Sequence, residues 1–268
     1  MKKVYLALMC MASLVMTTAC GGDKKADKAA DAESENTEMT ADNEQAEEQQ
    51  ADEQEQGNDE SVLLTPDKAE LLNLIDLYKN GDFKPATNII FVDTLKGETA
   101  GELPSKWDVK EGSAEVGEAL GHKYIVLSGG WSTLFPMVGE GSKDYLPDNF
   151  TYEFEFLFGG DVVFEVQSYN AEEVGIGTTR FWPDGMEWNY EKTDEEGIHG
   201  DKGELHKLLN SKGWNHFALS FNKGNLKLFI NGKRVANLPN IMQPGYITIV
   251  GSGANGESHF IKNVCIRK

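Results

Sequence analysis

The feature that most constrains the fold is a strict two-residue alternation in residues 151–158. Aromatic side chains fill every second position of this stretch: Tyr152, Phe154, Phe156 and Phe158. Glu153 and Glu155 stand between them. Because successive side chains of a β-strand point to opposite faces, this period predicts a strand with one face in the core. We therefore expect the aromatic row to be buried and the acidic row to face solvent.

Two turn motifs further along the chain predict consecutive hairpins. Residues 217–221 and 226–230 each carry an alternating apolar row, and Asn222-Lys223-Gly224-Asn225 joins the two rows. Asn231-Gly232 follows the second row. This dipeptide is favoured in type I′ turns because both of its residues tolerate a positive φ. The chain is therefore expected to reverse direction twice between residues 217 and 236.

Other short segments rich in strand-forming residues are separated by frequent glycines. They are Asn88–Val92, Lys123–Leu127, Trp131–Phe135, Val162–Gln167, Val174–Thr179, Tyr246–Val250 and Phe260–Ile266. The last segment alternates poorly around Lys262-Asn263, which predicts a β-bulge. Residues 204–209 have the pattern of one helical turn. Many short strands indicate an all-β sandwich, with Trp107 and Trp131 expected in its core.

The N-terminus predicts export. Two lysines precede an apolar run from Val4 to Met16, and small residues lead from there to Cys20. This layout is a secretory signal peptide, and with Cys at the junction it resembles a bacterial lipoprotein signal, in which Cys20 is lipidated. The expected location is the outer membrane, with the chain facing the periplasm or the cell surface. Ordinary cleavage after Ala19, which would release a soluble protein, is the alternative.

Residues 21–60 have the composition of a disordered tether. They consist almost entirely of Ala and polar or acidic residues, and they carry much of the formal net charge of −19. Such a segment cannot bury enough apolar surface to offset the entropy lost on ordering, and its like charges extend it. A solvated spacer explains this composition. An export signal that directs the lipoprotein to the cell surface is the alternative.

A short helix is expected between this tether and the sandwich. Thr65-Pro66-Asp67 matches a helix start, with Thr as the N-cap and Pro at the first helical position. Asn80-Gly81 matches a helix end.

Several segments together resemble a known domain family. They are Pro104–Trp107, Gly112–Val116, Tyr145–Thr151, Gly213–Phe221, Leu226–Lys233 and Phe260–Arg267. Two of these segments, Gly213–Phe221 and Leu226–Lys233, flank the first hairpin turn and resemble the signature of concanavalin A-like and laminin G-like jelly rolls. The whole set is similar to the domain that precedes the peptidoglycan-binding domain in some outer-membrane protein A family members. The sequence ends where that second domain would begin, so wall binding is not expected.

The resemblance implies a concanavalin A-like jelly-roll sandwich of antiparallel strands. The predicted organisation is a signal peptide in residues 1–19, an acidic tether in 20–60, a helix and connector in 61–84, and the jelly-roll domain in 85–268.

Glu153 and Glu155 are candidates for catalysis, with Glu165 nearby in the sequence. Two carboxyl groups that flank a glycosidic bond can serve as acid and nucleophile in its hydrolysis. Some jelly-roll glycosidases place three acids on one strand, and here the third acid is missing. A solvated strand face is the simpler interpretation. The closing strand also resembles jelly-roll domains of the 3-keto-disaccharide hydrolase type, which keeps a sugar-active hydrolase as an alternative.

The best candidates for ligand binding are Arg180, Trp182, Asp184, Trp188 and Tyr190. Aromatic faces stack on sugar rings, while neighbouring arginine and acidic side chains bond hydroxyl groups. A Pro-Asp-Gly turn in residues 183–185 would project the two tryptophans from adjacent strands. Core packing or cross-strand pairing of these aromatic rings is the alternative.

No cofactor is expected, and a calcium site is the one alternative. The potential ligands are Asp194, Glu195, Glu196, His199, Asp201 and His206. The resemblance points to calcium because laminin G-like domains use acids from loops. Neither EF-hand spacing nor a His-x-x-x-His pair is present, so a solvated loop is the simpler interpretation. Cys265 is the only cysteine beyond Cys20, which excludes an internal disulfide and a cysteine-based metal site in the mature lipoprotein.

The acidic composition is a poor match for nucleic acid, because contacts with phosphates supply most of that affinity. We therefore expect a membrane-anchored, non-catalytic domain that binds a glycan or an envelope protein. A sugar-active hydrolase is the first alternative, and a purely structural envelope protein is the second.

Overall fold

The structure is a computed structural model that describes residues 66, 69, 71–139, 141, 143–211, 213–253 and 257–268. The predicted signal peptide, Cys20, the acidic tether and the helix start at Thr65 lie outside these residues. Within the described part of the chain, no helix has the length and apolar character that a membrane span needs.

The described residues form one short helix, α1 (Leu74–Asn80), a 3₁₀ turn, η1 (Leu205–Lys207), and thirteen strands. The strands are β1 (Ile89–Asp93), β2 (Trp107–Ala119), β3 (His122–Pro136), β4 (Asn149–Phe158), β5 (Val162–Tyr169), β6 (Gly175–Trp182), β7 (Gly185–Tyr190), β8 (Ile198–Gly203), β9 (Asn215–Asn222), β10 (Asn225–Ile230), β11 (Lys233–Leu238), β12 (Tyr246–Gly253) and β13 (His259–Arg267). All pairs of these strands are antiparallel.

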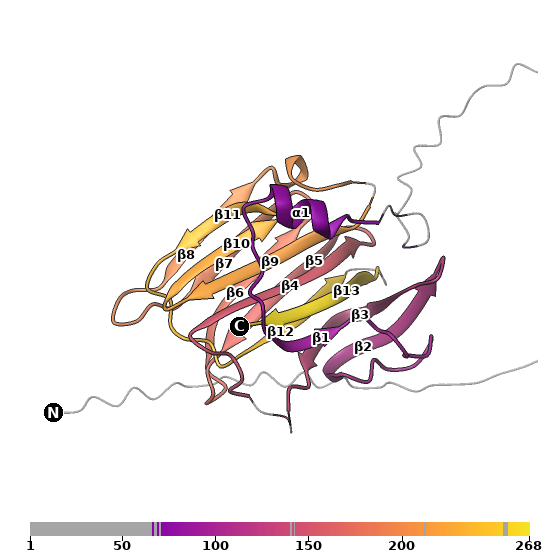
Figure 1. The fold of residues 1–268 in the computed structure, drawn as a ribbon, viewed down its shortest axis with the longest axis horizontal. Helices are drawn as coiled ribbons and strands as arrows, with labels where there is room; N and C mark the ends of the chain where they lie inside the picture. The colour runs from indigo at the N-terminus through magenta and orange to yellow at the C-terminus, as the bar shows by residue number, and fades with distance from the viewer. Residues whose placement is uncertain are drawn as a thin grey trace, which may run out of the picture. The chain divides into compact units, whose positions relative to one another are not determined.

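The strands form two layers that share one long strand, β3. One layer runs in the order β11-β10-β9-β4-β13, and the other runs β12-β5-β6-β7-β8. Residues 125–127 of β3 pair with β13, and residues 131–134 pair with β12. Gly129 and Gly130 lie between these two parts with φ of 88° and 94°, a conformation that strains residues other than glycine. The strand therefore passes from one layer to the other at this glycine pair. Figure 1 shows β3 in the fold, with the labels of β12 and β13 near it.

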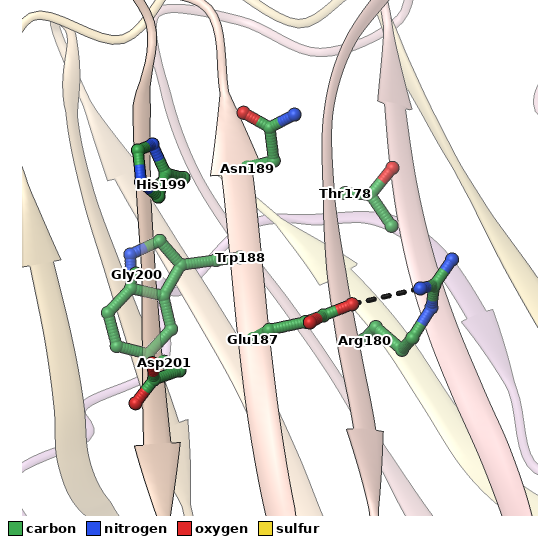
Figure 2. Close-up of a pocket in the computed structure, with 8 residues that line it drawn as sticks. All are labelled: Thr178, Arg180, Glu187, Trp188, Asn189, His199, Gly200 and Asp201. Atoms are coloured by element: carbon green, nitrogen blue, oxygen red, sulfur yellow. Dashed lines mark hydrogen bonds and ion pairs between the residues drawn. The ribbon is translucent and has the colours of Figure 1, made fainter.

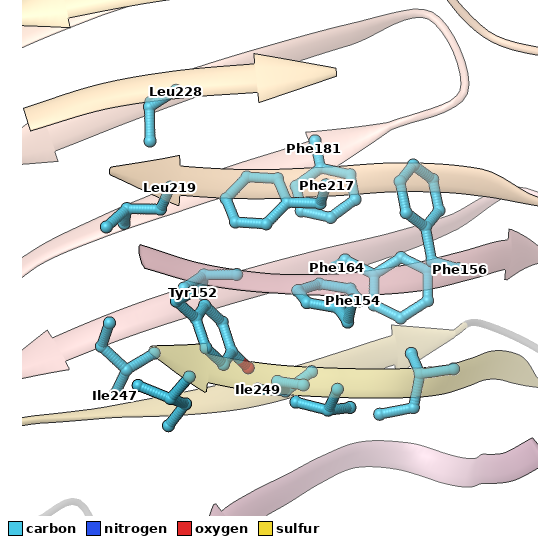
Figure 3. Close-up of a cluster of buried hydrophobic side chains, with 14 of the residues drawn as sticks. Tyr152, Phe154, Phe156, Phe164, Phe181, Phe217, Leu219, Leu228, Ile247 and Ile249 are labelled. Carbon is cyan, nitrogen blue, oxygen red and sulfur yellow. The ribbon is translucent and has the colours of Figure 1, made fainter. Parts of the chain in front are cut away.

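Aromatic rings fill the space between the layers (Figure 3). The rings of Phe181 on β6 and Phe217 on β9 stack with centroids 5.2 Å apart and an interplanar angle of 4°. Phe154 on β4 contacts both rings. Because β6 and β9 belong to different layers, these contacts show two sheets packed face to face. The predicted all-β jelly-roll sandwich and the buried aromatic row of β4 are confirmed.

The two predicted hairpin turns are also confirmed. Lys223 and Gly224 have φ of 46° and 83° between β9 and β10. Asn231 and Gly232 have φ of 47° and 73° between β10 and β11. Two consecutive residues with positive φ form the type I′ turn, whose twist matches that of the flanking strands.

The predicted bulge in β13 is present as well. The register of β13 against β4 shifts between Lys262 and Cys265, and Asn263 has a φ of 52°. The side-chain amide of Asn263 donates to Glu155 Oε1 at 2.6 Å, which holds the bulge in place. Cys265 is free and buried, and burial raises the pKa of its thiol to about 11.

Some of the predicted strands and the predicted helix have different bounds in the structure, and two strands were not predicted. The segments 123–127 and 131–135 are two parts of the single strand β3, and Trp131 is 51% exposed on its outer side instead of in the core. The helix starts at Leu74, because Asn73 caps it by accepting from the Asp76 amide. β2 and β8 were missed because each carries mostly polar side chains and, among the described residues, pairs along one edge only.

Candidate binding site

The outer face of the β5–β8 layer carries a continuous set of polar side chains. Phe164, Val166, Phe181 and Met186 point into the core. The alternate positions therefore point outward. They are Glu165 and Gln167 on β5, Thr178, Arg180 and Trp182 on β6, Glu187 and Asn189 on β7, and His199 and Asp201 on β8. We call this set the outer polar face.

Strand register sorts these side chains into two rows. Glu165, Arg180, Glu187 and Asp201 are consecutive register partners across the four strands. Gln167, Thr178, Asn189 and His199 form the adjacent row in the same way. Directly opposed residues have Cβ atoms about 5 Å apart, so each row is a contiguous line of hydrogen-bonding groups.

A hollow of about 430 Å³ opens on this face (Figure 2). Its lining residues are Thr178, Arg180, Glu187, Trp188, Asn189, His199, Gly200 and Asp201. A second hollow of about 250 Å³ shares Thr178 and Asn189 with the first and extends to Gln167 and Tyr169 on β5. The outer polar face is thus hollowed across four strands.

The guanidinium of Arg180 organises the centre of this face. Its Nε lies 2.7 Å from Glu165 Oε1, and its Nη1 lies 2.9 Å from Glu187 Oε1. Gln167 Nε2 donates to the other oxygen of Glu165 at 2.8 Å. The hydrogen bond to Glu165, which is itself buried, raises the pKa of Arg180. Charge-assisted bonds of this kind fix the rotamers of the side chains before any ligand arrives.

Aromatic rings flank the polar rows on both sides. The indole of Trp182 lies over Gly185, where a Cβ atom would come within 2.7 Å of it. On the other side, Tyr169 stacks on Tyr246 with centroids 5.0 Å apart and an interplanar angle of 9°. Trp131 stands on the same outer side of β3, half-exposed. Rings with one free face beside hydrogen-bonding groups suit the alternating apolar and hydroxyl surfaces of a sugar.

The structure brings together only some of the predicted ligand-binding residues. Arg180 lines the main hollow, and Trp182 follows it on the same face of β6. Trp188 contacts the hollow from the core side, with its indole across Gly200. Asp184 lies in the β6–β7 turn, where its Oδ1 is 2.6 Å from His206 Nδ1.

Tyr190 lies inside the sandwich. Its side chain is buried, and its hydroxyl is 2.9 Å from Thr179 Oγ1. Burial raises the pKa of this phenol to about 12. Tyr190 therefore belongs to the core packing, which was the alternative interpretation for this aromatic cluster.

The expectation that Glu153 and Glu155 face solvent was wrong. Both residues point away from the core but are only 2% exposed. Tyr78 on α1 donates its hydroxyl to Glu153 Oε2 at 2.7 Å, and Arg267 and His216 also pair with this carboxylate. The segment before β1 thus covers this outer face, and it leaves no room for a substrate beside Glu153.

Glu155 is buried in the same layer. Lys262 Nζ lies 3.4 Å from Glu155 Oε2, and Asn263 donates to Oε1. Both candidate acids are therefore occupied by internal partners, which does not suit a general acid or a nucleophile.

The loop considered for calcium does not gather ligands. Across the described ranges, no group of three His, Cys, Asp or Glu side chains is placed to hold a metal ion. Glu195 is paired instead with Lys192 at 2.8 Å and accepts from the Asn240 side chain at 3.0 Å.

The sequence signal for the central residues was present but weak. Glu165 and Gln167 alternate with Phe164 and Val166, which predicts their outward direction. Whether these two side chains lie near Glu187 depends on the β5–β6–β7 register, which no local pattern in the sequence specifies.

No family model matches the sequence, and no curated protein matches it. Solved structures with similar arrangements include the Bacillus licheniformis beta-glucanase, with 12% identity and a TM-score of 0.49 over 68% of this chain and 99% of that one. The binding domain of botulinum neurotoxin serotype D has 13% identity and a TM-score of 0.48, over 67% of this chain and 47% of that one. The apo Crh5 transglycosylase has 11% identity and a TM-score of 0.46, over 70% of this chain and 88% of that one.

The chain thus spans about half the length of the botulinum domains that it matches. At these identities and scores, the likenesses carry nothing about function. The sandwich itself is established by the strand pairing and by the contacts between the layers.

Proposed function

We propose that the protein is an envelope lipoprotein whose jelly-roll domain binds a glycan on the outer polar face without cleaving it. The observation that carries this proposal is the Arg180–Glu187 ion pair, which lines an open hollow and is fixed from below by the buried carboxylate of Glu165. Its side chains are held in place, and they leave further lone pairs and N–H groups for sugar hydroxyls. Trp182 and Tyr169 border the network with aromatic surface. A few fixed polar groups beside aromatic rings are the usual composition of a small-ligand site.

A glycan array probed with the chain from Gly21 onward tests this proposal. We expect a restricted set of bound glycans, and we expect Arg180→Ala to weaken binding of each at least about tenfold, because it removes the donor and releases two carboxylates. Arg234→Ala is the matched control, since Arg234 is exposed on β11 in the other layer. Loss of binding in both variants, or no bound glycan at all, would contradict the assignment.

A hydrolase is the second candidate, and one observation favours it. The carboxylates of Glu165 and Glu187 approach different nitrogens of the same guanidinium, so two acids lie close together, with Glu187 in the open hollow and Glu165 buried beneath Arg180. Hydrolysis by a carboxyl pair requires one of the two to carry a proton, whereas here both are ion-paired with Arg180. The geometry therefore favours binding over cleavage. Turnover of a bound glycan that disappears in Glu187→Gln would reverse this preference.

Anchoring through Cys20 is the second part of the proposal. An N-terminal acyl anchor would hold the domain at the outer membrane by way of the acidic tether. Labelling of growing cells with radioactive palmitate is expected to mark the wild type and to leave Cys20→Ala unlabelled. Label that persists in Cys20→Ala would refute the anchor at this residue, and protease treatment of whole cells would show which side of the membrane the domain faces.

A further inference from the structure

A basic pocket lies apart from the outer polar face and shares no lining residue with it. Three segments meet there: residues 94–97 after β1, residues 121–123 at the β2–β3 turn, and residues 262–263 at the β13 bulge. The pocket has a volume of about 320 Å³. Its charged or titratable lining residues are Lys96, His122, Lys123 and Lys262, and no carboxylate of the described residues lines it. The chain as a whole has a formal net charge of −19, so the charge of this pocket's lining is opposite in sign to that of the chain.

The segments around the pocket are held in place from inside the domain. Asp93 accepts from the Leu95 amide at 2.9 Å and from the indole N–H of Trp107 at 2.7 Å, and it is buried. Leu95 is buried with a positive φ of 58°, so the chain presents Lys96 outward at a defined point. The pocket is therefore a formed feature of the fold.

The four side chains differ in how far their charge is already compensated. Lys262 is buried between Glu155, at 3.4 Å, and the ring of Trp214, at 4.2 Å from its centroid. Lys123 donates to the Glu98 carbonyl and lies 3.9 Å from Glu118. Among the described residues, Lys96 and His122 have no such partner. The outer part of the pocket thus keeps donors for an anion.

An exposed leucine stands directly beside the pocket. Leu120 is 79% exposed at the tip of the β2–β3 hairpin, next to Gly121 and His122. Its φ is 51°, a left-handed conformation that strains a residue with a Cβ. Glycine or asparagine is the usual choice at such a turn. A leucine here strains the backbone and contributes almost no buried apolar surface in return, which points to a role outside folding.

We propose that this end of the domain docks on an anionic lipid surface. The basic pocket would receive a lipid phosphate, and Leu120 would enter the boundary between headgroups and acyl chains. Membrane surfaces reward this combination, because basic residues meet the anionic headgroups while an apolar side chain is buried beside them. A soluble phosphate compound would need the pocket but not the leucine.

Vesicle co-sedimentation tests the proposal with residues 21–268, which lack the predicted lipidation site at Cys20. Vesicles of equal parts phosphatidylglycerol and phosphatidylcholine are expected to bind the protein, and vesicles of phosphatidylcholine alone to bind it much less. Leu120→Asn should weaken binding about tenfold, because it removes the inserted side chain while asparagine accepts the positive φ. Lys96→Gln should weaken binding about fivefold.

Two matched variants act as controls at other positions. Val174→Asn replaces another exposed apolar residue, and Lys207→Gln replaces another exposed lysine, in η1. Both should bind as the wild type does. An equal loss in Val174→Asn and Leu120→Asn would overturn the proposal.

Titration with inorganic phosphate, combined with vesicle binding, distinguishes a lipid phosphate from a soluble phosphate compound as the ligand of the pocket. Shifts of the Gly97 and Gly121 amide signals, together with vesicle binding that depends on Leu120, support docking on lipid. Shifts of those signals without vesicle binding would assign the pocket to a soluble phosphate and refute docking. Absence of both would refute the pocket as an anion site.

Discussion

At the scale of single residues, the exposure of a charged side chain depends more on what covers it than on the direction in which it points. Glu153 on β4 and Glu165 on β5 both occupy positions that point away from the core. Tyr78 of the segment before β1 covers Glu153, and Arg180, which lines the open hollow, covers Glu165. Both residues are only 2% exposed. Strand alternation predicts the first property and says nothing of the second. The alternation in β4 therefore predicted exposed acids, although the structure buries them.

A buried histidine gives a prediction at this scale. His259 is packed against the Phe164 ring, and burial lowers its pKa to about 4, from about 6.5 in an unfolded chain. Between these values the unfolded state binds more protons than the folded state. Stability from this residue is therefore complete above pH 6.5 and declines as the pH falls towards 4, by up to about 1.4 kcal/mol per pH unit.

Urea denaturation of the wild type and of His259→Leu across this pH range measures that contribution. Carboxylates also titrate here, so the informative quantity is the difference between the two proteins. The free energy of unfolding is expected to fall less steeply with decreasing pH in His259→Leu. Parallel curves would show that His259 is not held neutral in the fold.

At the scale of elements, the chain's turns were the most predictable parts and its strand edges the least. Asn231-Gly232 carries its turn type in its own two residues, since each tolerates a positive φ. The strand β8 carries little apolar signal, because its only strand partner among the described residues is β7. The long strand β3 was split in prediction because its glycine pair resembles a turn, although it serves as a bend between layers. Local chemistry thus predicts turns, while pairing across the sheet determines where strands end.

The β9–β10 turn supplies a prediction at this scale. Gly224 has a φ of 83°, and the nearest atom to the position that an added Cβ would take is 3.5 Å away, so Gly224→Ala introduces backbone strain without a clash. We expect a loss of about 1–2 kcal/mol in the free energy of unfolding. Gly203→Ala is the matched control, because Gly203 lacks a positive φ and also has open space around it. Equal stability of the two variants in urea denaturation would argue against the type I′ geometry.

At the scale of the whole molecule, the two layers of the sandwich have different outer faces. The β4–β9–β13 face carries charged side chains that are paired internally and partly covered by residues 78–86. The outer polar face of β5–β8 is open, hollowed and bordered by aromatic rings. The sequence predicted the sandwich and two of the residues on the open face, Arg180 and Trp182. It did not predict which layer would be covered, because that depends on where the segment before β1 packs.

The central claim is that the open face binds a glycan, and amide chemical-shift mapping tests it most directly. A glycan found on the array is titrated into isotope-labelled protein, and the backbone signals are followed. The largest shifts are expected on Thr178, Arg180, Glu187 and Asn189, with no comparable shifts on β9 or β10. Shifts centred on β9 and β10, or saturable binding that leaves β6 and β7 unmoved, would contradict the claim.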